Sequence, residues 1–258
     1  MCILFLALGQ HPRYPLIVAA NRDEEFSRPS QHAEFWNDEP TIYGGRDLRA
    51  GGTWLAVNRA GLFSAITNLR EPMLYRDDAE SRGHLIPEYL RSQSPPKFKQ
   101  TLQSNRLNYN PYNLIFGSID KLTVFNSVRN SFTCLEKGFH SVSNGPVDDY
   151  WPKMSRGVSL LESHVKRRVN QDLDIDALFA DMLDTTQADE TVLPETGIGL
   201  EIEKRLSSIF ISGDSYGTRT TSILLFDRKQ LHFYERDYGP FAELQRENTQ
   251  CINIASTT

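Results

Sequence analysis

The sequence predicts an α+β fold in which two antiparallel sheets pack face to face and helices lie outside them, in one domain over residues 1–258. Short apolar segments of the β type alternate with turn signals through the first half of the chain. Two later segments, 152–168 and 174–185, carry apolar residues at helical spacing, so each can cover one face of a sheet. We find no internal repeat, low-complexity stretch or convincing linker that would divide the chain.

The individual elements follow from apolar periodicity and turn residues, in chain order. Strands are predicted at 2–8, 15–20, 53–57 and 61–67, and the last two are joined as a hairpin by residues 58–61. Helix-type patterns follow at 82–91 and 96–103, and a meander of four strands is predicted at 112–117, 122–126, 132–136 and 139–143. After the two later helices comes a loop rich in Thr, Glu, Pro and Gly at 186–200, and the final strands are predicted at 209–211, 222–226 and 231–235.

Charge and hydropathy exclude several classes of protein. The net charge is −5 and acidic and basic residues are interspersed, which argues against a nucleic-acid partner. Mean hydropathy is −0.45, and no stretch approaches the roughly 20 apolar residues of a membrane helix, so no integral membrane segment is expected. The apolar start is followed at once by Gln10, His11 and Arg13, unlike a secretory signal peptide.

Cysteine and histidine usage bears on compartment and cofactors. Cys2, Cys134 and Cys251 form no CxxC pair and leave one cysteine unpaired in any disulfide scheme, so reduced thiols in the cytoplasm are expected. The six histidines are scattered without the spacing of a metal site. We therefore predict neither a metal nor a cofactor.

Cys2 is the most informative residue, because it directly follows the initiator methionine. Removal of Met1 would leave a cysteine with both a thiol and a free α-amine. The pKa of such an amine is near 8 and that of a thiol near 8.5, so the amine can accept the thiol proton. The alternative is that Cys2 is a small apolar residue opening a buried strand, since free cysteine is often buried.

A polar cluster follows the second predicted strand, at Asn21, Arg22, Asp23 and Glu24. A solvated turn would explain it. However, antiparallel pairing of the first two strands about residues 9–14 would bring positions 2 and 23 nearly opposite. A carboxylate there could hold the α-amine of an N-terminal nucleophile.

Three further clusters could complete a site. Gly51 and Gly52 permit a close backbone approach ahead of Trp54, and Asn68 ends the strand that follows. Asn144 also ends a strand, in front of a Gly-Pro turn, and two such amides could form an oxyanion hole, although strand-end asparagines commonly make turns. Arg219, among small hydroxyl residues, could favour a thiolate or bind a substrate carboxylate; the alternative is a surface ion pair.

Together these motifs resemble the NRDE family, which takes its name from the 21–24 tetrad and includes the transport and Golgi organisation 2 proteins. The matching motifs are the Met-Cys start, 21–24, Gly-Gly-Thr-Trp at 51–54, Thr-Asn at 67–68, Ser-Asn at 143–144, Trp-Pro at 151–152 and Gly-Thr-Arg at 217–219. The family in turn resembles the cysteine N-terminal nucleophile (Ntn) hydrolases, such as penicillin V acylase and bile salt hydrolase. The resemblance implies a four-layer αββα sandwich.

The same resemblance implies a role for each site residue. Cys2 would be the nucleophile, Asp23 the partner of its α-amine, Asn68 and Asn144 the oxyanion donors, and Arg219 the stabiliser of the thiolate. Asn21, Arg22 and Trp54 would bind substrate or support the site. One departure concerns Ala20, which stands where the acylases carry an arginine, whereas here Arg22 precedes Asp23.

Two functions follow as alternatives. The first is an amidohydrolase that cleaves a non-peptide C–N amide bond of a small amide or acyl substrate after Met1 is removed. The second is a binding or trafficking protein without turnover, since members of the resembled group are linked to secretory organisation and haem mobilisation. The sequence favours the hydrolase, because it offers a candidate residue for each polar role in catalysis, whereas it shows no set of haem ligands.

Overall fold

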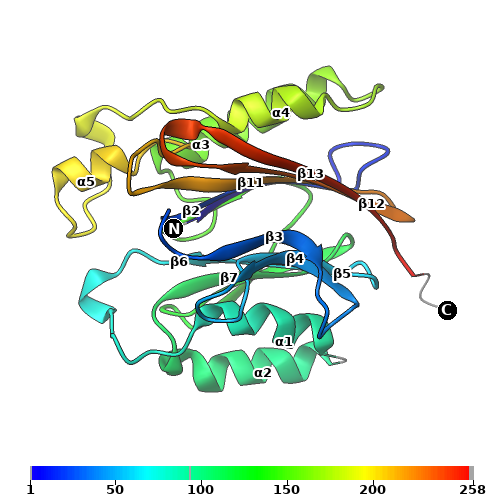
Figure 1. The fold of residues 1–258 in the computed structure, drawn as a ribbon, viewed down its shortest axis with the longest axis horizontal. Helices are drawn as coiled ribbons and strands as arrows, with labels where there is room; N and C mark the ends of the chain where they lie inside the picture. The colour runs from blue at the N-terminus through cyan, green and yellow to red at the C-terminus, as the bar shows by residue number, and fades with distance from the viewer. Residues whose placement is uncertain (1, 93, 256–258) are drawn as a thin grey trace.

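Two antiparallel sheets lie face to face at the centre of the molecule, with helices on both outer faces (Figure 1). The structure is a computed structural model and describes residues 2–92 and 94–255. Helices α3 (Pro152–Arg167) and α4 (Ile175–Met182) pack on one sheet, and α1 (Leu85–Arg91) covers the other, with α2 (Pro95–Asn105) in the same outer layer. The predicted α+β sandwich with four layers is confirmed.

The first sheet has six strands in the order β10-β1-β2-β11-β12-β13. In chain order they are β1 (Cys2–Leu8), β2 (Leu16–Glu25), β10 (Gly138–Val142), β11 (Tyr216–Phe226), β12 (Gln230–Tyr238) and β13 (Leu244–Asn253). Because β1 and β2 form the predicted hairpin at the middle of this sheet, the end of β2 that carries the 21–24 tetrad lies beside the start of β1.

The second sheet has seven strands, and they pair in sequence order. They are β3 (Ser30–Phe35), β4 (Ile42–Asp47), β5 (Leu55–Asn58), β6 (Phe63–Asn68), β7 (Tyr112–Ser118), β8 (Lys121–Asn126) and β9 (Ser131–Cys134). Short 3-10 helices lie at Pro72–Leu74, Arg82–His84, Arg106–Asn108, Glu190–Val192 and Pro240–Ala242, and the short helix α5 spans Leu200–Arg205.

The main core lies between the two sheets. Alternate residues of each strand point inward, as the two-residue period of a strand requires. The inward side chains include Leu4, Leu6, Val18, Leu224 and Phe233 from the first sheet and Val57, Phe63, Ile115 and Val124 from the second. At the sheet end that holds Cys2 and Arg22, polar residues take the place of these apolar ones.

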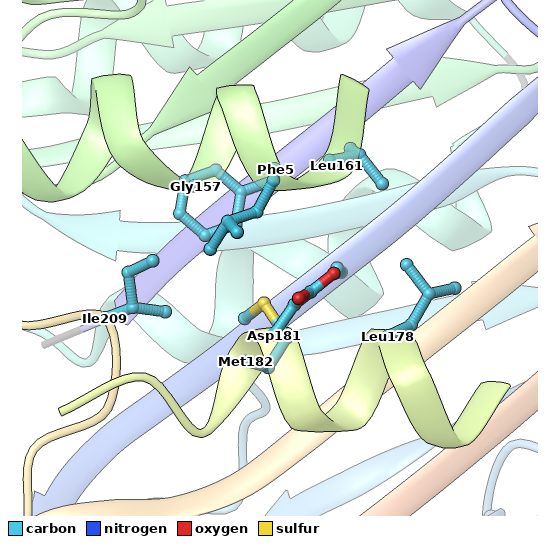
Figure 2. Close-up of a pocket in the computed structure, with 9 residues that line it drawn as sticks. Phe5, Gly157, Leu161, Leu178, Asp181, Met182 and Ile209 are labelled. Carbon is cyan, nitrogen blue, oxygen red and sulfur yellow. The ribbon is translucent and has the colours of Figure 1, made fainter. Parts of the chain in front are cut away.

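A second apolar layer joins the first sheet to α3 and α4, and Figure 2 shows it. Gly157 is required there, because a Cβ atom on it would lie 1.9 Å from the ring of Phe5. The crevice between these elements holds only about 10 Å³, about enough for one water molecule. It is a packing gap between layers and not a ligand site.

Several expected elements differ from the structure. The segment 139–143 does not continue the meander, because β10 crosses to the first sheet and pairs with β1. The segment 209–211 is buried but is not a strand; Ile211 instead accepts a hydrogen bond from the Thr218 backbone N–H. Strands β3, β4 and β13 and helix α5 were not predicted.

Candidate functional site

Cys2 lies at the open end of the hairpin and lines a cavity of about 530 Å³ between the two sheets. In the register of β1 and β2, Cys2 is paired with Arg22, and Asp23 lies one position further along. Positions 2 and 23 are therefore nearly opposite, as expected, with Asp23 one residue beyond the direct partner of Cys2. Cys2 is half-buried, and its backbone carbonyl accepts a hydrogen bond from Ser143 Oγ at 3.2 Å.

The cavity wall is mostly charged and polar. Besides Cys2 it includes Arg22, Asp23, Glu24, Glu25, Arg28, Asp47, Arg49, Trp54, Asn68, Arg76, Asp77, Glu80 and Arg82. Among the described residues no histidine lines it. Such a wall suits a polar substrate better than a large apolar one.

The surroundings of Cys2 favour a neutral thiol. Burial raises the pKa of the thiol, and the negative charges of Asp23 and Glu24 raise it further. The positive charge of Arg22 lowers it. A thiol of this kind needs a base to become a nucleophile near neutral pH. A free α-amine on the same residue would be such a base.

Asp23 is buried and fixed by its neighbours. Thr218 Oγ1 donates a hydrogen bond to Asp23 Oδ1 at 2.7 Å, across the paired strands β2 and β11. Burial raises the pKa of the Asp23 carboxyl, whereas the charges of Lys153 and Arg22 and the Thr218 hydrogen bond lower it. A buried carboxylate in this position can attract an ammonium group beside it.

Arg22 crosses the cavity and lies over the indole of Trp54, with 4.2 Å between the guanidinium carbon and the ring centroid. Its side chain is only 5% exposed, and Arg22 Nη2 is 3.7 Å from Glu24 Oε2. A cation over a ring in this geometry is attracted by the negative face of the ring. Arg22 and Trp54 therefore form one wall beside Cys2.

Asn21 points away from this cavity. Its Nδ2 group donates to the backbone carbonyls of Met182 at 2.9 Å and Ile209 at 3.0 Å, and its Oδ1 accepts from Thr221 Oγ1 at 2.6 Å. It thereby ties the first sheet to α4 and to the 209–211 segment. These contacts give Asn21 a structural role.

Asn68 and Asn144 are brought together, as expected. Asn68 lines the cavity with Cys2, and Asn144 Nδ2 donates a hydrogen bond to the Asn68 backbone carbonyl at 2.9 Å. An amide has two N–H donors, so this bond leaves one on Asn144. Ser143 Oγ lies 3.3 Å from Asn144 Oδ1 and also donates to the Cys2 carbonyl, which links the asparagine pair to the start of β1.

The sequence analysis missed Lys153, a buried residue in the first turn of α3. Lys153 Nζ donates to Asn144 Oδ1 at 3.1 Å. Burial lowers its pKa to about 8, although the negative charges of Asp23 and Cys2 act in the opposite direction. A signal was present, because Lys153 lies on the same i, i+4 stripe as Gly157, Leu161 and Val165, which face the sheet.

Arg219 is not brought to Cys2. It lies at a β-bulge of β11, where the register with β2 shifts, and its Nη1 donates to the backbone carbonyls of Glu25 and Arg28. Its side chain lines a separate cavity of about 220 Å³, together with His32, Asp237 and Arg246. The bulge turns this side chain away from Cys2, so this structure gives no support to Arg219 as a thiolate stabiliser.

The rest of the described chain adds two observations. No group of three or more His, Cys, Asp or Glu side chains that could hold a metal occurs in residues 2–92 and 94–255. None of the helices in the described part of the chain is long and apolar enough to cross a membrane.

Comparisons with known proteins agree with this fold. Crystal structures of two variants of the conjugated bile acid hydrolase from Clostridium perfringens superpose with TM-scores of 0.54 and 0.53 at 11% and 12% identity, covering 98% and 97% of this chain and 92% of each of theirs. At such identities the likeness shows a shared Ntn-hydrolase-type fold and no more.

Sequence relatives are more similar. The Transport and Golgi organization protein 2 homologs of Homo sapiens and Bos taurus are 33% and 31% identical to this chain over 249 residues, covering 88% of it and 89% of each relative. The Drosophila melanogaster Transport and Golgi organization protein 2 is 27% identical over 91% of both chains. The profile of the family Transport and Golgi organisation 2 matches residues 1–240. The chain belongs to the Transport and Golgi organisation 2 family.

Proposed function

We propose that this protein is an N-terminal nucleophile amidohydrolase that cleaves the C–N bond of a small amide with Cys2 as nucleophile. The observation that carries the proposal is the position of Cys2, half-buried in a polar cavity and beside the buried carboxylate of Asp23. The Ntn-hydrolase-type fold supports it, because that fold places the first residues of the chain at the open end of a sandwich.

In the first half of the reaction, the α-amine freed by removal of Met1 takes the proton of the Cys2 thiol. The sulfur then attacks the amide carbonyl, a C–S bond forms and the carbonyl oxygen becomes an oxyanion. Asn68 and the remaining N–H of Asn144 donate hydrogen bonds to that oxygen. Asp23 holds the ammonium, and Arg22 moderates the negative charge near the sulfur.

In the second half, the C–N bond breaks and the ammonium gives its proton to the leaving nitrogen. A water molecule, deprotonated by the same amine, attacks the thioester. The carboxylic acid leaves, and the proton returns to the Cys2 sulfur, so that the enzyme is regenerated. We place this chemistry in the reducing cytoplasm, where an exposed Cys134 and Cys251 and a reactive Cys2 would stay reduced.

The alternative is a binding or trafficking protein that keeps the scaffold without turnover, in line with the names of the curated relatives. The charged wall of this cavity fits the apolar macrocycle of haem poorly, although Cys2 and Tyr75, residues of types that can ligate haem iron, line it. A binding protein would hold amides with equal affinity whether or not Cys2 carries a thiol.

The test is a screen of small amides against the wild type, Cys2→Ala and the matched control Cys134→Ala, which changes an exposed cysteine. We expect the wild type and the control to hydrolyse at least one amide, and Cys2→Ala to lose at least about a thousandfold in kcat, because covalent catalysis needs the sulfur. Turnover that survives in Cys2→Ala would contradict the proposal. Binding of amides without hydrolysis by any of the three proteins would favour the alternative.

A further inference from the structure

Arg82 is a half-buried cation on the wall of the Cys2 cavity. Its Nη1 donates to the backbone carbonyl of Pro111 at 3.0 Å, and that carbonyl also accepts the backbone N–H of Leu69, next to Asn68. Burial lowers the pKa of Arg82. Arg82 and Cys2 line the same cavity. Among the described residues Arg82 forms no ion pair with a carboxylate.

The other arginines of the cavity wall either lie beside a carboxylate or are exposed. Arg28 forms an ion pair with Asp47 at 2.6 Å, and Arg22 lies over Trp54 and beside Glu24. Arg49 and Arg76 are exposed to solvent. Arg82 still has donors to offer a ligand, since a guanidinium carries five N–H groups and one bond to Pro111 uses one of them. Arg22 Nη1 is also buried without a hydrogen-bond partner, but the Arg22 guanidinium already lies over Trp54 and near the Glu24 carboxylate.

The backbone around Arg82 is held rigidly. A Cβ atom on Gly52 would lie 2.5 Å from the Gly83 carbonyl carbon, so the two loops are in direct backbone contact. The Thr53 N–H donates to the Gly83 carbonyl at 3.1 Å, and His84 Nε2 lies 2.6 Å from the Ala50 carbonyl oxygen. The backbone that carries Arg82 is therefore held in place, and the bond to Pro111 orients its guanidinium, which reduces the entropy cost of binding.

We propose that Arg82 binds a carboxylate of the substrate, so that the substrates of this site are amides that carry a carboxylate close to the scissile bond. This inference rests on the proposed amidohydrolase function. A guanidinium matches the two oxygens of a carboxylate. A single negative charge fits better than a dianion, because the same wall already carries Glu24, Asp77 and Glu80.

The test compares two alkylating reagents that differ only in this group. Iodoacetate carries a carboxylate and iodoacetamide a neutral amide; in both cases a bond forms from the Cys2 sulfur to carbon and iodide leaves. We expect Arg82→Gln to lower the alkylation rate of Cys2 by iodoacetate about tenfold, because the charge-assisted pair is lost. The rate with iodoacetamide should change less than about twofold. Arg82→Lys, which keeps the charge and loses the planar fork, should lie between.

The matched control is Arg76→Gln, which removes the same charge from an exposed position of the wall and should lower the iodoacetate rate less than about threefold. Equal losses with both reagents would show that Arg82 acts on the thiol, and unchanged rates with both would show that it binds nothing here. Either result overturns the inference.

Failure of the proposed function gives a different result. If neither reagent alkylates Cys2 in the wild type, the nucleophile is absent. In that case, binding of N-acetylglycine and of N-acetylglycinamide is measured by titration followed by nuclear magnetic resonance. This tests carboxylate binding by Arg82 without requiring a reactive Cys2. A preference for N-acetylglycine that Arg82→Gln abolishes supports the inference; equal binding of both compounds, or a preference that survives the substitution, overturns it.

Discussion

Lys153 fixes the orientation of an amide in the candidate site from inside the protein. Its ammonium donates to Asn144 Oδ1, and this bond directs the Asn144 Nδ2 group toward the Asn68 carbonyl. An oxyanion hole works only if its donors are held in place before charge develops. Lys153 is thus a positioning residue in the proposed mechanism.

Replacement of Lys153 tests that role. We expect Lys153→Met to lower acylation of Cys2 by an activated acyl ester about tenfold or more, because Asn144 loses its fixed orientation. Alkylation by iodoacetamide should stay within about twofold, since no oxyanion forms in that reaction. Lys153→Arg, which keeps a donor, should recover part of the acylation rate. The readout is the ratio of the two rates, measured by mass spectrometry.

A purely structural Lys153 would give another pattern. Loss of local packing would lower both rates together, because Cys2 itself would be displaced. Asn144→Ala serves as the reference, with an expected loss of about a hundredfold in acylation alone. If acylation by Lys153→Met equals that of the wild type, Lys153 has no part in positioning the amide.

At the scale of elements, β12 and β3 connect the two sheets through a buried carboxyl. Glu235 on β12 is 2% exposed, and its Oε1 accepts the backbone N–H of Ala33 at 2.7 Å, across the layers. Burial raises the Glu235 pKa to about 8, and Asp237 adds to this, whereas the Ala33 and Ser222 hydrogen bonds and Arg246 oppose it. The folded protein therefore favours the protonated form of Glu235 at this contact between β12 and β3.

The stability of the sandwich should depend on pH as a result. The folded pKa lies above the unfolded value of 4.5, so the protonated carboxyl contributes its full stability below pH 4.5, and this contribution is lost as the pH rises through about 8. We expect Glu235→Gln, which stays neutral, to exceed the wild type in free energy of unfolding by on the order of a few kcal/mol above pH 8.

The measurement is denaturant unfolding at pH 5, 7 and 9, with the gap between variant and wild type growing across the series. Glu243→Gln makes the same chemical change at an exposed position and should show no such trend. A constant gap at all three pH values would mean that Glu235 keeps its charge inside the sandwich.

Element prediction succeeded where a strand is buried and missed β13. The apolar residues of β1, β6 and β7 follow directly from burial between layers. Strand β13 is an edge strand exposed over most of its length, so its sequence lacks an apolar face. Conversely, the apolar segment 209–211 is buried without a strand partner, because Asn21 and Thr218 satisfy its backbone groups.

Part of the site was predictable from the pairing of strands and from where the strands end. Hairpin pairing of β1 and β2 brings Cys2 beside the 21–24 tetrad, and strand ends bring Asn68 to Asn144. The position of Arg219 depends on a β-bulge, and that of Lys153 on how α3 packs on the sheet. The bulge is not a local property of the sequence. The i, i+4 stripe of α3 does place Lys153 on the face toward the sheet, but its contact with Asn144 depends on how the helix packs.

At the scale of the whole molecule, two sheets lie between outer layers of helices (Figure 1). Cys2, at the start of β1, lines a polar cavity. A shared fold does not by itself give a shared reaction. What would make this protein a hydrolase is one covalent event, the loss of Met1, which turns Cys2 into a residue with its own base.

The most direct measurement is mass spectrometry of the intact protein before and after treatment with an activated acyl ester, followed by peptide mapping. We expect a mass without Met1 and a single acyl group on Cys2, because only this thiol combines a cavity, a base and a buried carboxylate. Retention of Met1, or acylation of Cys134 or Cys251 in place of Cys2, would contradict the N-terminal nucleophile.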